Sequence, residues 1–339
     1  MEPRQSCTRQ IIIEAKDEAF ILANKNHIAA VTTHSKDEFI KTEKIGHLPY
    51  GIAIKCPKKQ EELEFPVIEQ YIALCKKHFK TQMHDKAAFY YLYGADDFQS
   101  LRAAVIAMTD LCGKTIVTEI HVGEDARMQD NTDALAALGV LQRIGVSTMV
   151  FTSDMPEQLE DTLERVAPYA RISIGVRVPT EWLNDNIKLT NVEMLLPDES
   201  ENADMLCNAL KKYKSGRTAS RDHDDYILAP DGRDAHFIDA VTDISDEIEC
   251  DHKLQQRLLE IEDEEAAALK LMLTEEDDLY NLEEDLYMLT RPVCLCAATP
   301  ELLEKALRIY SGLAIYDGTW ELAPEVAKYF CEKYGMILL

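Results

Sequence analysis

The sequence predicts an α/β protein with parallel strands, and residues 114–178 give the main reason. Three short apolar runs rich in β-branched residues, at 115–120, 148–152 and 172–178, are typical of buried parallel strands. Two segments between these runs, 132–144 and 157–167, have apolar residues at helical spacing and predict amphipathic helices. Parallel strands joined by helices over short connections imply right-handed crossovers, so this region predicts a β-α-β-α-β unit.

The same alternation extends along the chain in both directions. Upstream, we expect strands at 10–14, 19–23, 27–33, 52–55 and 87–93, with helices at 64–79 and 98–111. Asp97 precedes the second of these helices and is expected to be its N-cap. Downstream, we expect strands at 191–196, 237–244, 269–274, 292–297, 313–317 and 336–339, with helices at 203–213, 252–268, 300–310 and 323–334. Residues 213–225 are rich in Ser, Gly and charge and predict a linker between two units.

Composition and charge exclude several classes of protein. The chain has 339 residues, of which 46% are hydrophobic, so it can bury a substantial core in one large or two medium domains. Its net charge of −25 argues against nucleic acid and anionic membranes as partners, because both bind through clustered Lys and Arg. There is no apolar run of about 18 residues and no signal-peptide core, so we expect a cytoplasmic protein with reduced cysteines.

Several motifs in the central region carry a family resemblance. They are the segment 97–105, the loop Glu124-Asp125-Ala126-Arg127, the step Thr132-Asp133-Ala134-Leu135 and the helix start Pro156-Glu157-Gln158-Leu159. With this spacing the chain resembles the homocysteine S-methyltransferase family, in particular the first barrel of cobalamin-dependent methionine synthases. The resemblance implies a TIM-type (β/α) barrel over residues 1–214, followed by a linker at 215–235. Residues 1–60 lack the family's Gly-rich first strand, which leaves open whether the barrel is complete.

The C-terminal residues resemble a second barrel of the same enzymes. Residues 292–317, including the helix segment 300–307, look like part of the pterin-binding barrel of methionine synthases. The resemblance implies that residues 236–339 form a truncated half-barrel α/β domain. Because a half-barrel exposes strand edges, we expect it to pack on the first domain or to form a homodimer through this C-terminal unit, rather than stand as a small open sheet.

The positions that carry the family's chemistry are replaced. In the family, three cysteines hold a zinc ion that binds the homocysteine sulfur; the first maps to Thr152, and the other two map to residues 196–200, where there is no cysteine. A neutral hydroxyl is a poor zinc ligand. The polar groups that face the pterin map to residues 272–274, Cys296 and Asp317. The resemblance therefore implies that both the zinc site and the folate site are lost, and we expect no metal and no cofactor.

Polar residues nevertheless end several predicted strands. In a barrel the carboxyl ends of the strands meet at one mouth, so the following side chains are candidates for a pocket: Tyr93, Glu119, His121, Thr152, Ser153 and Arg177, with Asp317 in the second unit. His121 and Glu119 share a strand face and could form an acid–base pair, although a solvent-exposed histidine is the favoured alternative.

Two other groups of residues have a plain alternative to a functional role. Cys294 and Cys296 also share a strand face, yet no second cysteine pair accompanies them, and core cysteines are favoured over a metal site. The acidic runs 275–278 and 283–285 could attract a divalent cation or a basic partner, but solvated loops and helix starts are the default interpretation.

The sequence thus favours a non-catalytic, degenerate methionine synthase-like protein. It would bind a small molecule or a partner, such as a corrinoid protein or a methyltransferase, in one-carbon or corrinoid methyl-transfer metabolism. Two alternatives stay open: an active zinc-independent methyltransferase acting on a different acceptor at the barrel mouth, and a structural subunit that completes a partner's barrel. Whether the chain is an enzyme is therefore open at this point; if it is, a methyltransferase of the homocysteine S-methyltransferase type is expected.

Overall fold

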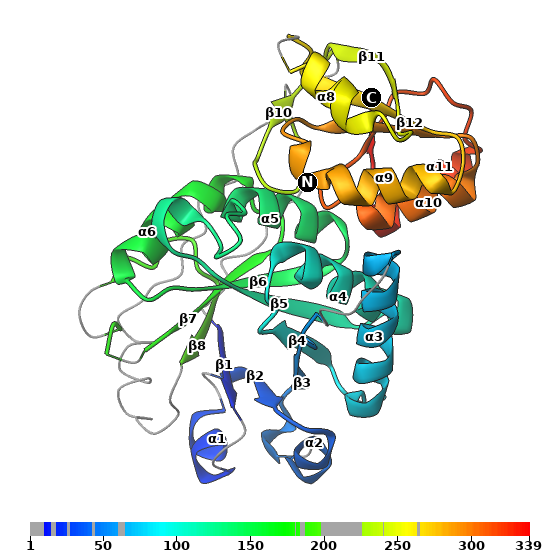
Figure 1. Cartoon of the computed structure of the whole chain (residues 1–339). Helices are drawn as coiled ribbons and strands as arrows, with labels where there is room; N and C mark the ends of the chain where they lie inside the picture. The colour runs from blue at the N-terminus through cyan, green and yellow to red at the C-terminus, as the bar shows by residue number, and fades with distance from the viewer. Residues whose placement is uncertain are drawn as a thin grey trace.

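Eight parallel strands form a closed barrel, in the order in which they occur along the chain (Figure 1). The computed structural model describes residues 10–14, 18–25, 28–42, 45–59, 65–179, 181–183, 187–197, 226–239, 241–262 and 265–339. The strands of the barrel are β1 Gln10–Glu14, β2 Ile28–Thr33, β3 Tyr50–Lys55, β4 Phe89–Tyr93, β5 Thr115–His121, β6 Val146–Thr152, β7 Ser173–Val178 and β8 Met194–Pro197. The ring closes where Ile11 of β1 pairs with Leu195 of β8.

The closed ring confirms a TIM-type barrel and settles the question left by residues 1–60. These residues supply three of the eight strands, so the barrel is complete in its sheet although its first strand lacks the family's glycine motif. The predicted strands at 10–14, 27–33, 52–55, 87–93, 115–120, 148–152, 172–178 and 191–196 all correspond to strands of this ring.

Helices connect the strands and surround the ring. They are α1 Glu18–Asn24, α2 Lys36–Thr42, α3 Val67–Gln82, α4 Phe98–Leu111, α5 Ala134–Arg143 and α6 Pro156–Val166. The strand predicted at 19–23 is wrong, because these residues form α1, in which Ile21 is buried while its neighbour Leu22 is exposed. A short apolar run does not distinguish a strand from a half-buried helix. In the described part of the connection from β7 to β8 there is no helix, and α2 was not predicted.

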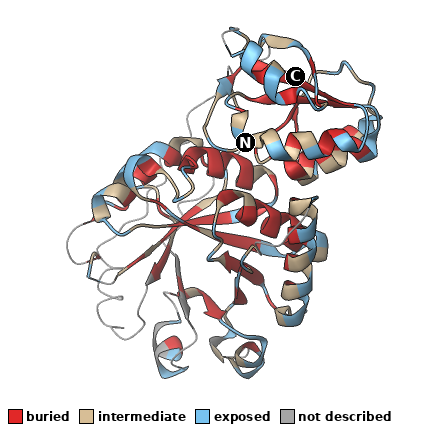
Figure 2. Ribbon diagram, viewed as in Figure 1, coloured by how far each residue is buried: buried red, intermediate tan, exposed pale blue. Residues whose placement is uncertain are grey.

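Side chains fill the inside of the barrel. Alternate residues on each strand point inward, and they form a separate apolar cluster of Ile12, Ala30, Ala53, Phe89, Tyr91, Val117, Val150 and Leu196. Gly51 of β3 leaves room for the ring of Phe89, since a Cβ at position 51 would lie 2.4 Å from that ring. The barrel therefore has a packed core, and any ligand would have to bind above it. Figure 2 shows the buried residues following the strands.

The C-terminal unit is a five-stranded parallel sheet with the strand order β11-β12-β13-β14-β15. Its strands are β11 Ile244–Glu249, β12 Ala268–Leu273, β13 Val293–Ala297, β14 Ile315–Tyr316 and β15 Ile337–Leu338, and its helices are α8 Leu254–Glu260, α9 Asp277–Asp285, α10 Pro300–Ile309 and α11 Pro324–Tyr334. Because the strand order follows the chain, right-handed crossovers place the connecting helices on one face of the sheet. A short hairpin, β9 Ile227–Leu228 and β10 Phe237–Ile238, precedes it.

Two predictions in this unit need correction, and two others fall outside the residues that the structure describes. The strand predicted at 237–244 is interrupted, because the Asp239 carboxylate accepts the Val241 N–H and forms a turn between β10 and β11. The helix predicted at 252–268 ends at Glu260, and Ala268 already belongs to β12. Of the two acidic runs, 275–278 leads into the first turn of helix α9, as expected for a helix start, and 283–285 forms its last turn. The predicted helix 203–213 and the linker 213–225 lie outside the described residues.

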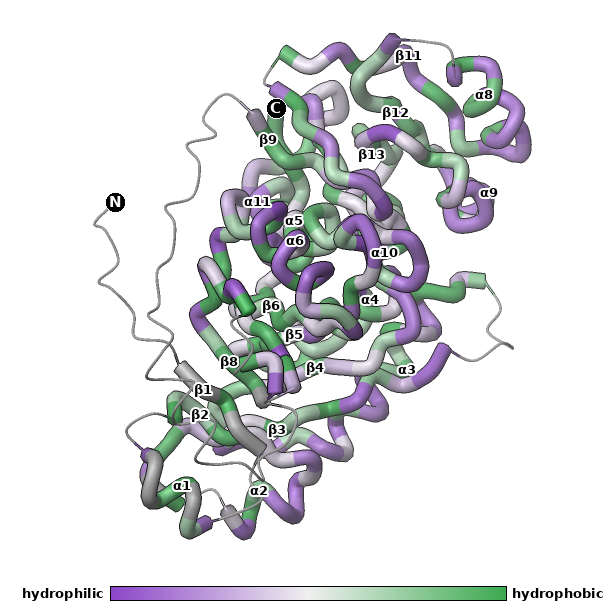
Figure 3. The backbone as a smooth tube through the Cα atoms, turned by 90° about the vertical axis from the view of Figure 1, so that its left-hand side faces the viewer, coloured by the Kyte–Doolittle hydropathy of each residue, from purple (hydrophilic) through white to green (hydrophobic). Residues whose placement is uncertain are grey.

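The C-terminal unit packs on the outer helices of the barrel: α10 contacts α3, and α11 contacts α5. Arg102 of α4 is 2% exposed and donates to the carbonyls of Leu307 and Arg308, at 2.6 and 2.9 Å, at the end of α10. The Asp110 carboxylate lies 2.6 Å from the Lys76 ammonium and 3.0 Å from that of Lys333 in α11. Charged side chains therefore anchor the open sheet of the C-terminal unit to the barrel. Figure 3 shows mostly hydrophilic turns at α10.

Candidate functional site

A charged network lies inside the barrel above its apolar core. Tyr91 on β4, Glu119 on β5 and Arg177 on β7 point inward from strands that the barrel brings together. The Tyr91 hydroxyl donates a short hydrogen bond to Glu119, and the Arg177 Nε donates to the same carboxylate oxygen at 2.7 Å. A second guanidinium nitrogen of Arg177 donates to the Tyr91 hydroxyl at 3.0 Å. The three side chains form a closed ring of hydrogen bonds, which we call the interior triad.

Burial and mutual contact fix the protonation states of Tyr91 and Arg177 in the interior triad. Burial raises the pKa of Tyr91 well above its usual value, and the neighbouring Glu119 carboxylate raises it further. Burial alone would lower the pKa of Arg177, but Tyr91 and Glu119 outweigh burial and raise it. Tyr91 is therefore a neutral donor and Arg177 a permanent cation paired with Glu119. The interior triad can hold a polar ligand group by hydrogen bonding, but its charges already compensate one another.

Aromatic rings lie beside the interior triad, on the side of the barrel mouth. Tyr93 stacks on Tyr91 with ring centroids 6.0 Å apart and an interplanar angle of 21°. His34, which follows β2, meets Tyr93 edge-on at 6.2 Å. Sequence reasoning identified Tyr93 but missed Tyr91 and His34. The alternation along β4 could have identified Tyr91, because residues two apart on a strand face the same side.

His121, Thr152 and Asp154 form a second polar group at the rim. The His121 Nδ1 lies 3.0 Å from the Thr152 hydroxyl, and its Nε2 lies 3.6 Å from the Asp154 carboxylate. The Thr152 hydroxyl also donates to the Ile120 carbonyl at 3.4 Å. The side chains of His121 and Asp154 are 52% and 90% exposed, so solvent reaches this group freely. His121 thus contacts Thr152 and Asp154, whereas Glu119 contacts Tyr91 and Arg177.

Ser153 and Asp317 lie apart from these groups. The Ser153 hydroxyl lies 3.1 Å from the Gln158 side chain and accepts the Met155 N–H at 3.3 Å, at the start of α6. Asp317 follows β14 of the C-terminal unit, where the Lys270 ammonium lies 3.0 Å from its carboxylate. The structure thus brings Tyr93, Glu119, His121, Thr152 and Arg177 to one end of the barrel and leaves Asp317 in the other unit.

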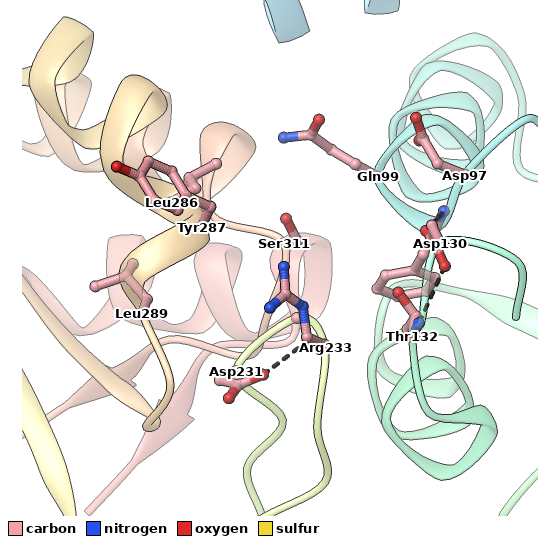
Figure 4. A pocket seen from close by; sticks show the side chains of 12 residues that line it. Asp97, Gln99, Asp130, Thr132, Asp231, Arg233, Leu286, Tyr287, Leu289 and Ser311 are labelled. Carbon is pink, nitrogen blue, oxygen red and sulfur yellow. Dashed lines mark hydrogen bonds between the residues drawn. The ribbon is translucent and has the colours of Figure 1, made fainter. Parts of the chain in front are cut away.

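A cavity of about 190 Å³ lies at the junction of the two units (Figure 4). The carboxylates that line it accept hydrogen bonds from backbone N–H groups. The Asp130 carboxylate accepts the Phe98 N–H at 2.6 Å and the Thr132 N–H at 3.1 Å, and the Asp231 carboxylate accepts the Arg233 N–H at 2.7 Å. Asp97, also on this wall, accepts the N–H of Ser100 at 2.6 Å and caps α4 as predicted. We therefore assign these carboxylates to holding the start of α4 and the neighbouring loops rather than to chemistry.

Comparisons with known proteins give only distant likenesses. No family model matches the chain, and no curated protein does. Among solved structures, the apo form of a homocysteine methyltransferase from Escherichia coli is 9% identical with a TM-score of 0.44, covering 62% of this chain and 96% of that one. Orotidine 5'-monophosphate decarboxylase from Methanocaldococcus jannaschii is 13% identical with a TM-score of 0.35, covering 62% and 98%. A type I 3-dehydroquinate dehydratase from Clostridium difficile is 10% identical with a TM-score of 0.39, covering 61% and 94%.

These likenesses are too weak to assign an activity. Among the helices that the structure describes, none combines the length and the apolar character needed to cross a bilayer. The established point is the fold: the strand pairing of the chain itself makes residues 10–197 a TIM-type barrel with a polar group at one end.

Proposed function

We propose that the chain is a degenerate, non-catalytic relative of the homocysteine S-methyltransferases that binds a small molecule at the mouth of its barrel. The observation that supports this most is the interior triad, in which Glu119, Arg177 and Tyr91 satisfy one another. A catalytic site needs a group whose charge or proton is available to the substrate. Charges paired within the barrel instead provide a fixed polar floor for a ligand.

The residue at the position of the family's first zinc ligand agrees with a site without zinc. Thr152 carries a hydroxyl that stays protonated near neutral pH, and zinc ligands are thiolates, imidazoles or carboxylates. This hydroxyl is engaged with His121 at 3.0 Å and with the Ile120 carbonyl at 3.4 Å. The proposed setting is one-carbon or corrinoid methyl transfer, where the protein would hold a ligand or meet a corrinoid protein without transferring the methyl group itself.

The test is a binding experiment on the full chain, with homocysteine, methionine and methylcobalamin as probes. We expect one of the probes to raise the melting temperature of the wild-type chain but not that of the Arg177→Met variant. We also expect no transfer of a methyl group from methylcobalamin to homocysteine, with or without added zinc. The matched control is Arg257→Met, which removes an arginine of the C-terminal unit that pairs with Glu249 and Asp251. Zinc-dependent formation of methionine would overturn the proposal.

The polar group at the rim of the barrel, formed by His121, Thr152 and Asp154, favours a second candidate. This candidate is an active zinc-independent methyltransferase with a different acceptor. His121 lies 3.0 Å from the Thr152 hydroxyl and 3.6 Å from Asp154, so a base oriented by a carboxylate stands at the mouth. This candidate predicts methyl transfer to an amine, thiol or alcohol probe that is lost in His121→Gln and kept in His252→Gln, a histidine of the other unit. Equal activity in the two variants would dismiss it.

The third candidate, a structural subunit or a homodimer through the C-terminal unit, rests on the edge strand β15. Leu338 and Leu339 are 51% and 39% exposed there. It predicts a dimer by light scattering that dissociates in the Leu338→Lys variant; a monomeric wild-type chain would exclude the homodimer.

A further inference from the structure

The strand register of the C-terminal sheet brings several polar side chains together on one face of the sheet. Glu247 on β11 pairs with Lys270 on β12, and Lys270 pairs with Cys294 on β13, so the three residues form one row across the sheet. Cys294 in turn pairs with Ile315 on β14, which places Cys296 and Asp317 together in the next row, on the same face. Two thiols and two carboxylates therefore surround one lysine on one face of the sheet, and Cys296 and Asp317 lie nearest the carboxyl ends of their strands, where open α/β sheets bind their ligands.

We propose that Cys294, Cys296 and Asp317 bind a zinc ion in the C-terminal unit. The two sulfur atoms and a carboxylate oxygen lie within 4.8 Å of one another. In a tetrahedral zinc site, bond lengths of roughly 2.0–2.3 Å set the ligand atoms about 3.5–3.8 Å apart, so only a small closure is needed. Thiolate ligands select zinc over magnesium and calcium, and three protein ligands leave a fourth position for water.

Charge compensation supports a divalent cation at this place. Cys294 and Cys296 are 0% and 1% exposed, so their thiolates need nearby positive charge. Two thiolates and the Asp317 carboxylate are neutralised by a divalent ion together with the Lys270 ammonium, which lies 3.0 Å from Asp317. In their thiol form the two cysteines carry no charge, and Lys270 balances Asp317. The ion thus replaces two protons and leaves the charge of the buried group unchanged.

The groups around Asp317 hold it as metal ligands are usually held. One of its carboxylate oxygens accepts the Thr319 N–H at 3.0 Å, and the other lies 3.0 Å from the Lys270 Nζ. Lys270 is itself fixed, because it also donates to the Thr319 hydroxyl at 2.9 Å and lies 3.4 Å from Glu247. Hydrogen bonds of this kind orient a ligating carboxylate and tune its affinity for the metal.

The other roles open to the two cysteines fit less well. Residues two apart on one strand have parallel Cβ directions, so their Cβ atoms stay about 6.6 Å apart, beyond the roughly 3.5–4.5 Å that a disulfide needs, and a disulfide would require the backbone to move. A nucleophile must be reached by its substrate, whereas both thiols are buried. The sequence favoured core cysteines because no second pair was found; the register of β14 now brings Asp317 to them.

The test uses cobalt as a spectroscopic substitute for zinc. The reduced full chain, freed of metal by a chelator, is titrated with Co²⁺ and then with Zn²⁺. We expect one equivalent of Co²⁺ to give thiolate-to-metal charge-transfer absorption and tetrahedral ligand-field bands, both removed by one equivalent of Zn²⁺. Cys296→Ser should weaken the charge-transfer absorption, and Asp317→Asn should keep that absorption but lower the affinity by more than about tenfold. The matched control is Cys250→Ser, a buried cysteine of the same unit, which should not change the titration.

Three outcomes would overturn the proposal. One is the absence of charge-transfer absorption in the wild-type chain, and another is an unchanged titration in both Cys296→Ser and Asp317→Asn. The third is an equal loss of binding in Cys250→Ser. Asp317→Asn preserves shape and leaves the buried cysteines in place, so it remains informative if Cys296→Ser fails to fold. The test is also independent of the barrel: zinc that remains bound in Cys296→Ser and supports homocysteine binding would count against the proposed function instead.

Discussion

Removing the cation from the interior triad should destabilise the barrel strongly, and removing its partner charge as well should partly restore it. In Arg177→Met, the Glu119 carboxylate loses the guanidinium at 2.7 Å and keeps the Tyr91 hydroxyl. The side chains of Arg177 and Glu119 are only 18% and 17% exposed, so water replaces the lost partner poorly. Leaving one charge of a buried pair unpaired costs about 3–5 kcal/mol, and we expect the lower end because this network lies near the mouth.

Urea unfolding measures this cost. The chain has two tryptophans, Trp182 after β7 of the barrel and Trp320 in the C-terminal unit, so a Trp320→Phe background makes the fluorescence report on the barrel. A loss of about 3 kcal/mol should lower the urea midpoint by about 1 M or more. Arg257→Met, which breaks exposed pairs with Glu249 and Asp251 in the C-terminal unit, should leave the urea midpoint of the barrel nearly unchanged.

The sign of the second change decides the reasoning. Glu119→Gln has the same shape and still accepts hydrogen bonds but carries no charge. Added to Arg177→Met, it should recover about 1–2 kcal/mol, because no unpaired charge is then left inside the barrel. If the double variant is less stable than Arg177→Met by the full cost of Glu119→Gln alone, the two side chains act independently, and the charge-pairing argument is refuted.

Three further outcomes follow from the packing and the interface. Arg102→Met should lower the stability of the chain by about 3 kcal/mol in urea, because it leaves the Leu307 carbonyl at the end of α10 without its donor; a change below about 1 kcal/mol would contradict this. Gly51→Ala should cost about 1–3 kcal/mol, since the new methyl group meets the Phe89 ring at 2.4 Å, whereas Gly113→Ala has open space and should be nearly neutral. Burial alone would raise the pKa of Asp110, but the hydrogen bonds from its two lysine partners lower it below the usual value. This stabilisation is present above the unfolded pKa of about 4 and is lost as the pH falls through the lower folded value. Hydrogen exchange at the interface should rise over that acid range in the wild-type chain, and Asp110→Asn should abolish this pH-dependent part.

The elements that the sequence predicted well are those whose pattern is local. Helix α4 begins at Phe98 and ends at Leu111 as predicted, because Asp97 caps it and its apolar residues keep helical spacing. Closure of the barrel was not predictable, since the pairing of β1 with β8 joins Ile11 to Leu195 and neither strand shows in its own sequence which strand it will pair with. Residues 19–23 show the converse limit, because a run of five apolar residues fits a strand and a half-buried helix equally.

The site follows the same rule. Glu119 and Arg177 could be named as strand-end residues, but their contact joins β5 to β7, and only the closed ring brings them together. Cys294 and Cys296 could be placed on one strand face by their spacing alone. The approach of Asp317 depends on the register between β13 and β14, which a single sequence does not encode locally.

Arg102 of the barrel donates hydrogen bonds to backbone carbonyls of the C-terminal unit, so neither unit can be replaced without regard to the other. A helix ends with carbonyl groups that need donors, and α10 receives two of these from a side chain of the barrel. Separating the two units would leave the carbonyls at the end of α10 without these donors and would expose the apolar surfaces and the Arg102 guanidinium of the interface to solvent. Any other unit grafted onto this barrel would have to present two carbonyl acceptors at the position of the Arg102 guanidinium. The two units are therefore expected to be exchanged only together with this contact.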